Sequence, residues 1–261
     1  MNITHRPSPN RNTGRQGHRP DIVVCHITEG AIQGTLDWIS PRPGETIAQY
    51  HARVPAERRV SYHFTVSRLG IITQHVDITD TAWANGTTTG ADNRGNRHSR
   101  IAAVRDRNVN ANLYTVSIGF EGRLNEMQGD LTPAQLGAAV LLIRYIDEVL
   151  TQLYDVVIPF DREHIVGHAD IAPRWKPNCP GGRFPFDGII EKLLEVDEMR
   201  LESVLDMPEN LQPEMRRLIE EGSIRGTGRR LPNGELELNI LESVALSAIV
   251  ASRVVDSRVG G

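Results

Sequence analysis

The chain has 261 residues, of which 39% are hydrophobic and 24% charged, and its 29 Lys and Arg against 33 Asp and Glu leave a formal net charge of −4. This is the composition of an ordinary globular protein, and the length lets one large domain, or one domain with a small addition, bury its own core. It excludes a disordered chain and a small disulfide scaffold. No apolar run reaches the roughly 18 residues of a membrane span, and the mild acidity argues against duplex nucleic acid as the main partner.

The first 20 residues form a polar segment with four Arg, no acidic residue and no apolar stretch of the kind found in signal peptides. They show no apolar periodicity. We therefore expect residues 1–20 to be an arm that is loose or laid over the surface.

From residue 21 onward, short apolar and β-branched runs predict strands, and helical segments separate them. The expected strands cover residues 21–28, 61–67, 70–76 and 113–122, and the expected short helices cover residues 34–40 and 47–53. Residues 87–100 form a polar, glycine-containing segment, which predicts a loop.

A longer helix is predicted from Thr132, whose hydroxyl suits a helix N-cap and is followed by Pro133. Apolar residues then recur at helical spacing as far as Leu153. A strand or loop near residues 165–173, an irregular Pro- and Gly-rich segment and a closing helix at about 188–195 follow. Strands interleaved with helices indicate an α/β or α+β domain over residues 21–195.

Residues 196–261 differ in composition, with 8 Arg, 12 acidic residues and no His, Cys or aromatic residue. Apolar spacing predicts one helix that ends near Gly222 and a second over residues 244–254, with a turn between them. We expect a small helical module that begins near residue 200. Two roles stay open: attachment to a partner surface through Arg225, Arg229 and Arg230, or a helical pair that stabilises the larger domain.

The two cysteines, Cys25 and Cys179, each lie in a segment that also carries a histidine. A disulfide or two buried thiols would account for them. If residues 21–28 form a strand, Cys25 and His26 point to opposite faces, so only one can meet a given partner. Two imidazoles and a thiolate, from His26, His168 and Cys179, would make a zinc site with an open fourth position. With nine histidines in the chain, the residues alone leave this choice open.

Six motifs follow one another along the chain: VVCHITEG, SYHFTVSRLG, TAWANG, SIGFEG, LTPAQ, and GHADIAP with KPNCPGG. In this order they resemble the zinc-dependent N-acetylmuramoyl-L-alanine amidases of the type shared by phage endolysins and peptidoglycan recognition proteins, over residues 21 to about 195. The resemblance implies an α/β (α+β) fold with a central mixed β-sheet flanked by helices and a zinc ion in a groove. It also implies that His26, His168 and Cys179 bind the zinc.

The resemblance suggests three catalytic residues. Tyr62 matches a tyrosine beside the zinc, where a phenol can hydrogen-bond the oxyanion, and His63 would face the other way. Glu121 matches a glutamate that some relatives use as a base or as a group that supports the zinc site, and that others lack. Lys176 lies three residues before Cys179 rather than the usual two, so either Lys176 or Asn178 would stabilise the oxyanion.

Trp83, Asn85 and Trp175 are candidates to line a sugar or peptide groove, although buried tryptophan is as common. In TAWANG the usual relatives carry His where Ala84 stands, so one substrate-binding imidazole is missing.

The resemblance implies cleavage of the amide between N-acetylmuramic acid and the L-alanine of the stem peptide in bacterial peptidoglycan. The alternatives are a non-catalytic peptidoglycan-binding module and a cytosolic amidase that recycles muropeptides. We expect neither a nucleic acid partner nor membrane insertion, and the sequence leaves the oligomeric state open. We also expect synthesis in the cytoplasm without a signal peptide, with access to the wall after lysis-linked release, as for a phage or prophage endolysin.

Overall fold

The computed structural model describes residues 3–197, 200–201, 203–207, 209, 211–224, 229–238, 240–241 and 245. The chain divides into a larger compact unit over Asn2–Glu191 and a smaller one over Lys192–Gly261. The division falls within helix α7 (Phe186–Asp197), close to the predicted boundary near residue 200. Within the described ranges, no helix combines the length and the apolar character that crossing a membrane requires.

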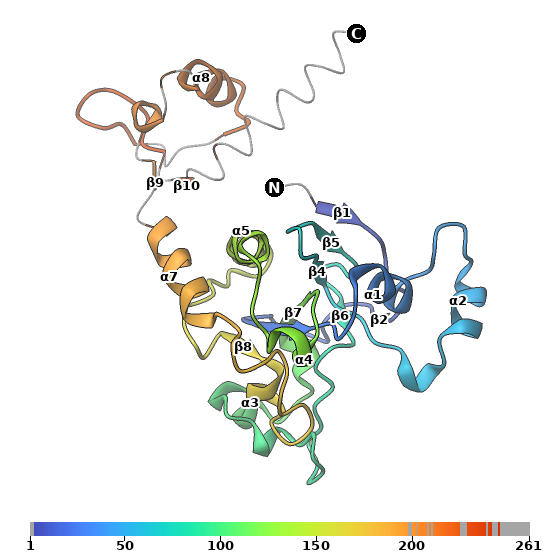
Figure 1. Ribbon diagram of the computed structural model, residues 1–261. Coiled ribbons are helices and arrows are strands. Elements are labelled where there is room, and N and C mark those ends of the chain that lie inside the picture. Colours follow the sequence, from blue (N-terminus) through green and yellow to red (C-terminus); the bar gives the residue numbers. More distant parts are fainter. Residues whose placement is uncertain are drawn as a thin grey trace. The chain divides into compact units, whose positions relative to one another are not determined.

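The larger unit is built on one six-stranded mixed sheet with the strand order β1-β5-β4-β7-β3-β8 (Figure 1). In this sheet β4 and β5 pair antiparallel, and the other neighbours are parallel. The strands are β1 (Ile3–His5), β3 (Ile22–Ile27), β4 (Phe64–Val66), β5 (Ile72–Gln74), β7 (Thr115–Phe120) and β8 (Ile165–Gly167). The predicted mixed sheet is therefore confirmed.

Helices flank the sheet as expected. They are α1 (Ile32–Ile39), α2 (Ile47–Arg53), α3 (Ala102–Arg107), α4 (Leu124–Met127), α5 (Pro133–Tyr154), α6 (His168–Ile171) and α7. The predicted N-cap is confirmed, because the Thr132 hydroxyl accepts the Gln135 N–H in a capping box. The sequence did not predict α3, α4 or α6, because each has only four to six residues and lacks a clear apolar period.

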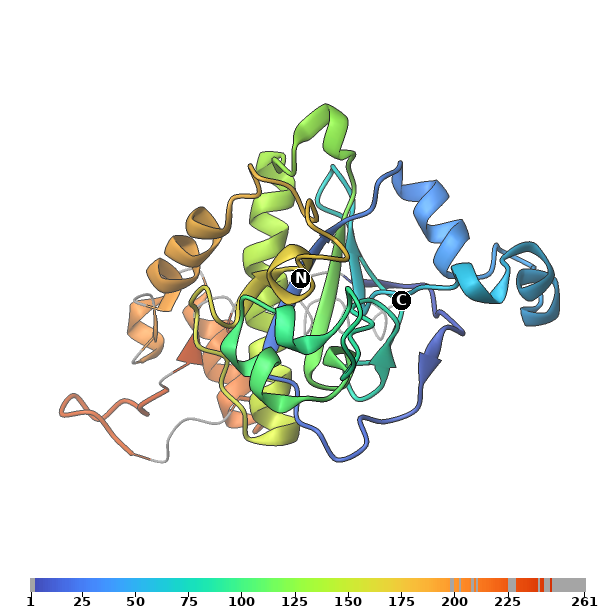
Figure 2. The ribbon, with the colours of Figure 1, turned by 90° about the horizontal axis from the view of Figure 1, so that it is seen from below.

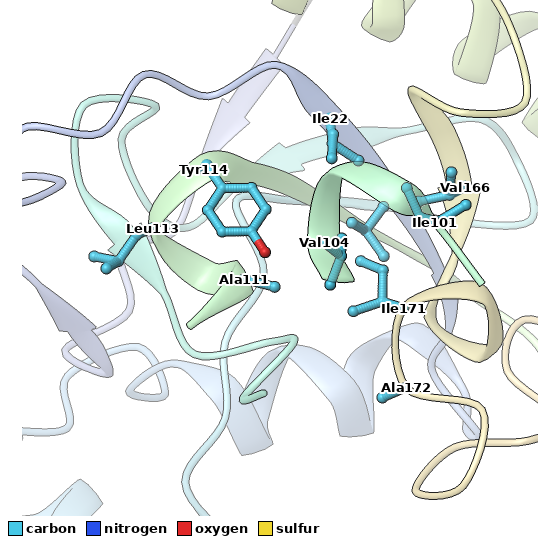
Figure 3. Close-up of a cluster of buried hydrophobic side chains, with 10 residues drawn as sticks. Ile22, Ile101, Val104, Ala111, Leu113, Tyr114, Val166, Ile171 and Ala172 are labelled. Carbon is cyan, nitrogen blue, oxygen red and sulfur yellow. The ribbon is translucent and has the colours of Figure 1, made fainter. Parts of the chain in front are cut away.

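The two faces of the sheet are covered by different layers. Figure 1 shows α5 on one side and α3 on the other, and Figure 2 views the larger unit from the α3 side. On the α3 side, apolar residues from β3, β8, α3, α6 and the short helix Ala111–Tyr114 form one buried cluster (Figure 3). It contains Ile22, Val24, Ile101, Val104, Ala111, Leu113, Tyr114, Val166, Ile171 and Ala172. This cluster supports the amino-terminal half of β3 and leaves its carboxyl end for the site.

Residues 3–20 contribute strands to the fold, where we expected an arm that is loose or laid over the surface. β1 extends the sheet by pairing with β5, and β2 (Arg11–Asn12) pairs with β6 (Thr81–Ala82). Arg15 is only 4% exposed, and its guanidinium donates to the carbonyls of Ile78, Leu113 and Thr115 at 2.6–3.1 Å. Sequence patterns miss this because the strands are short and the partners of Arg15 are backbone groups far along the chain.

The smaller unit has its own apolar core and includes a strand pair besides its helix. β9 (Arg200–Leu201) pairs antiparallel with β10 (Ile240–Leu241), and α8 (Gln212–Glu220) covers the predicted first helix. Its core consists of Val204, Met207, Met215, Leu218, Ile224, Leu238 and Ala245. The predicted second helix over residues 244–254 lies outside the described residues, apart from Ala245, and so does Arg225.

The buried guanidinium of Arg15 leads to a stability prediction. Arg15→Ala leaves several buried carbonyls without a donor, and each hydrogen bond to a charged group contributes roughly 1.5–3 kcal/mol. We expect the free energy of unfolding of the larger unit to fall by about 3 kcal/mol or more, measured by urea denaturation. Arg15→Lys, which keeps the charge without the planar fork, should recover only part of the loss. A change within about 0.5 kcal/mol, as at an ordinary surface position, would show that the segment is dispensable.

Candidate metal centre

The first candidate ligand, His26, lies near the carboxyl end of β3, between parallel neighbours β7 and β8. Side chains alternate along a strand, and the structure has the predicted consequence: Cys25 is fully buried, and it is His26 that reaches the ligand cluster. His26 itself is 2% exposed. In the register of the sheet His26 is paired with Gly119 of β7.

The second ligand, His168, begins α6 directly after β8 ends. Asp170 fixes this change of direction, because its carboxylate accepts the Gly167 N–H at 2.8 Å and a donor of Arg162 at 3.1 Å. The Ala169 N–H in turn donates to the carbonyl of Cys179 at 2.7 Å. The backbone and carboxylate of the GHAD motif thus fix both the position of its own histidine, His168, and the loop that carries Cys179.

A close backbone approach fixes the loop that carries Cys179. Gly181 has φ +123°, and a Cβ there would lie 2.2 Å from the carbonyl oxygen of Gln128. The same carbonyl accepts the Arg183 N–H at 2.9 Å. The turn after Cys179 therefore needs glycine at this position to pack against the segment before α5.

The three predicted ligands converge. One ligand atom from each of His26, His168 and Cys179 lies within 4.8 Å of the others, and Sγ of Cys179 is 3.9 Å from Nδ1 of His26. Zinc binds imidazole nitrogen at about 2.0–2.1 Å and thiolate at about 2.3 Å, which separates tetrahedral donors by roughly 3.3–3.8 Å. Small side-chain movements are enough to bring these donors to one ion. Nitrogen and sulfur donors also suit zinc chemically.

Burial prepares the imidazoles to bind a metal. It lowers the pKa of His26 well below the usual range, with the neighbouring His168 acting in the same direction. Burial and the charge of Lys176 lower the pKa of His168 to about 3. Both imidazoles are neutral near pH 7, the form that coordinates metal. Burial raises the pKa of the Cys179 thiol to about 11, so a bound metal ion would displace the thiol proton.

The ligands lie at the bottom of an open cavity of about 390 Å³. Its walls come from six parts of the chain: the end of β3, the segment before β4, the turn after β6, the start of α4, the start of α6 and the cysteine loop. The lining residues besides the ligands include Glu29, Val60, Tyr62, Ala84, Leu124, Trp175, Lys176 and Asn178. Ala84 is at this wall, so the imidazole that the usual relatives carry there would have faced the cavity.

Tyr62 lies beside the ligands, as predicted. Its ring is 5.2 Å from the His26 ring and packs on Gly119, where a Cβ would come within 2.9 Å of the tyrosine. Burial raises the pKa of the phenol above its usual range, so the hydroxyl stays protonated and can donate a hydrogen bond. His63 faces away, as expected, and its Nδ1 accepts the Ser117 N–H at 3.0 Å.

Glu121 does not line the cavity. Its carboxylate accepts the Ile32 N–H at the start of α1 at 2.9 Å and the Arg68 N–H at 2.7 Å. The described residues that line the cavity include one carboxylate, that of Glu29. The sequence motifs did not single out this residue. The available signal was its position three residues after His26, in a Glu-Gly turn where Glu29 has φ 58°.

Of the three residues predicted to line a substrate groove, only Trp175 is among the described residues that line the cavity. Trp175 lines the cavity and is 50% exposed, with Lys176 Nζ 5.8 Å from the centre of its ring. Trp83 is half-buried and donates to Asn12 at 3.1 Å, outside the cavity lining. Asn85 is 1% exposed and is not among the residues that line the cavity.

Together, the fold and the donor set define a mixed α/β domain in which two imidazoles and one thiol lie close enough to hold a metal ion. The sequence profile of the N-acetylmuramoyl-L-alanine amidase family, Amidase_2, matches residues 16–182. The chain belongs to this family. No curated protein sequence matches the chain significantly.

Solved structures of amidases resemble the chain. A selenomethionine derivative of AmpD is 20% identical, with a TM-score of 0.47, and the match covers 73% of this chain and 93% of AmpD. The amidase LysC from Clostridium intestinale URNW is 19% identical, with a TM-score of 0.45, and the match covers 74% of this chain and 98% of LysC. A point mutant of PlyL is 16% identical, with a TM-score of 0.46, and the coverages are 74% and 99%.

The convergence of the three ligands predicts the outcome of removing one. His168→Ala should weaken zinc binding by more than the roughly 100-fold that loss of an outer-shell partner can cause, measured by chelator competition on the purified chain. His164→Ala is the matched control, because that imidazole is paired with Asp161 at 2.7 Å outside the cluster. Full zinc stoichiometry and affinity in His168→Ala would contradict the assigned ligand set.

Proposed function

We propose that this chain is a zinc-dependent amidase that cleaves the bond between the lactyl group of N-acetylmuramic acid and the L-alanine of the stem peptide. The observation that carries the proposal is the convergence of His26, His168 and Cys179 in an open cavity of a chain that belongs to the amidase family. A non-catalytic binding module would not need these donors. Their presence together therefore favours an enzyme.

The residues around the cavity divide the chemistry of amide hydrolysis among them. When bound, zinc supplies Lewis-acid polarisation of the carbonyl and makes water a better nucleophile near neutral pH. The protonated phenol of Tyr62 would donate a hydrogen bond to the carbonyl oxygen as negative charge develops there. Lys176, at the cavity wall, would stabilise the negative charge on the same oxygen, and the leaving amine would gain the proton that the general base takes from the attacking water.

A carboxylate is needed to accept the proton of the attacking water, and we assign this role to Glu29 rather than Glu121. Glu29 lines the cavity and accepts the Leu124 N–H through one carboxylate oxygen at 3.4 Å, whereas both carboxylate oxygens of Glu121 accept backbone N–H groups, at 2.9 and 2.7 Å. Glu121 would then support the site by holding the start of α1 and the turn at Arg68.

We propose that the substrate is polymeric peptidoglycan, so that the enzyme degrades the wall like an endolysin. The half-exposed Trp175 at the mouth of the cavity supports this, because an aromatic face can stack on a sugar or a peptide group of a long substrate. The smaller unit has its own core, which suits a separate module, and its attachment to the wall through Arg229 and Arg230 stays a prediction.

Product analysis tests the proposed activity. The purified zinc-loaded chain should release new N-terminal L-alanine from intact sacculi and create no new reducing sugar ends, as identified by mass spectrometry. Soluble muropeptide offered in parallel separates the two amidase roles, because a recycling enzyme would cleave it and leave sacculi intact. New reducing ends without new amino termini would identify a glycosidase.

The two glutamates should respond differently to the same substitution. Glu29→Gln should lower turnover of soluble muropeptide by roughly 100-fold, the usual effect of losing a general base, with little change in stability because Glu29 is exposed. Glu121→Gln should lower the free energy of unfolding by about 1–3 kcal/mol, because an amide cannot accept both N–H donors. Urea denaturation and steady-state kinetics measure the two effects. Wild-type turnover in Glu29→Gln would show that another residue acts as the general base.

A further inference from the structure

One buried side chain beside the metal ligands has no role in the function proposed above. Asn85 is 1% exposed and follows β6, in the TAWANG motif. Its Oδ1 and the Nε2 of His26 are both buried, and neither has a hydrogen-bonding partner at normal distance among the described residues. One is an acceptor and the other can be a donor.

The hydrogen bonds of Asn85 determine which way its amide points. Its backbone N–H donates to Asn112 at 2.6 Å, and its Nδ2 donates to the hydroxyls of Thr115 and Ser117 at 2.8 and 3.0 Å. The hydroxyl of Thr115 uses its own hydrogen on the carbonyl of Ala111, so toward Asn85 it can only accept. The nitrogen of the amide therefore faces β7, and Oδ1 faces away from it.

His26 needs an acceptor on one nitrogen if the other is to bind metal. Its Nδ1 is the atom near Sγ of Cys179, so Nδ1 faces the ligand cluster and Nε2 faces the interior. Metal binding through Nδ1 requires the tautomer with the proton on Nε2. Outer-shell acceptors commonly fix this tautomer and the orientation of the ring in metal sites.

We propose that Asn85 is the positioning residue of His26: its Oδ1 accepts the Nε2–H of the imidazole and holds Nδ1 toward the metal. Asn85 and His26 lie in the same region of the sheet, because Asn85 donates to Ser117, which is two residues before Gly119 on β7, and Gly119 is the register partner of His26. The proposal rests on the metal site of the proposed function and adds a residue outside the cavity to it.

The test compares zinc affinity in two buried asparagine variants. Asn85→Leu removes the acceptor, and its zinc affinity should fall 10- to 100-fold, on the order of an outer-shell loss, in chelator competition. Asn96→Leu is the matched control: Asn96 is also 1% exposed, its Nδ2 donates to Val109 at 2.8 Å and its Oδ1 has no partner among the described residues. It should retain wild-type zinc affinity. Asn85→Asp keeps an acceptor oxygen and should recover most of the affinity lost in Asn85→Leu.

A second measurement uses the unaltered protein and does not depend on the folding of a variant. Nitrogen NMR of the zinc-loaded full chain should show His26 protonated on Nε2. A proton on Nδ1 of His26, or wild-type zinc affinity in Asn85→Leu, would overturn the role of Asn85 and leave the amidase proposal intact. Failure of the unaltered chain to bind zinc would overturn both.

Discussion

The parallel pairing of β3 with β7 is the constraint on which the site depends. Its register places His26 beside Gly119 and Val24 beside Ser117, and alternation sends these residues to one face and the apolar Val23 and Cys25 to the other. The missing side chain of Gly119 makes room for the ring of Tyr62. A shift of one residue would exchange the two faces, burying the histidine in the core and exposing Cys25 to the cavity.

The rest of the site is attached to this strand pair through backbone groups. The carbonyl of Cys179 accepts the Ala169 N–H, the Asp170 carboxylate holds the Gly167 N–H, and the Glu121 carboxylate joins α1 to the turn at Arg68. Side chains that would suit chemistry in another setting therefore serve here to fix loops. Rigid loops allow the ligands to converge before any metal is bound.

What the sequence could predict follows from the range of each interaction. Apolar runs predicted β3, β4, β5 and β7, and a local cap predicted α5, because those signals lie within a few residues. Through the family resemblance, the motifs singled out His26, His168 and Cys179, which the structure brings together, and Tyr62, which lies beside His26; the roles of these residues stay predictions. The sequence did not predict the strand β1, the burial of Arg15, or the hydrogen bonds of Glu121 and Asn85. Each depends on a partner between 27 and 100 residues away, which no local pattern indicates.

A metal ion held by the three candidate ligands would also cross-link the chain. His26 and Cys179 are 153 residues apart in sequence, so an ion that joins them would close a loop spanning nearly the whole larger unit. Closing a loop of this length removes much conformational freedom from the unfolded chain, and an ion that binds only the folded form stabilises it by mass action. The smaller unit has a core of its own and contributes none of the three ligands. Zinc supply would thus govern how long the larger unit survives proteolysis, while the stability of the smaller unit rests on its own packing.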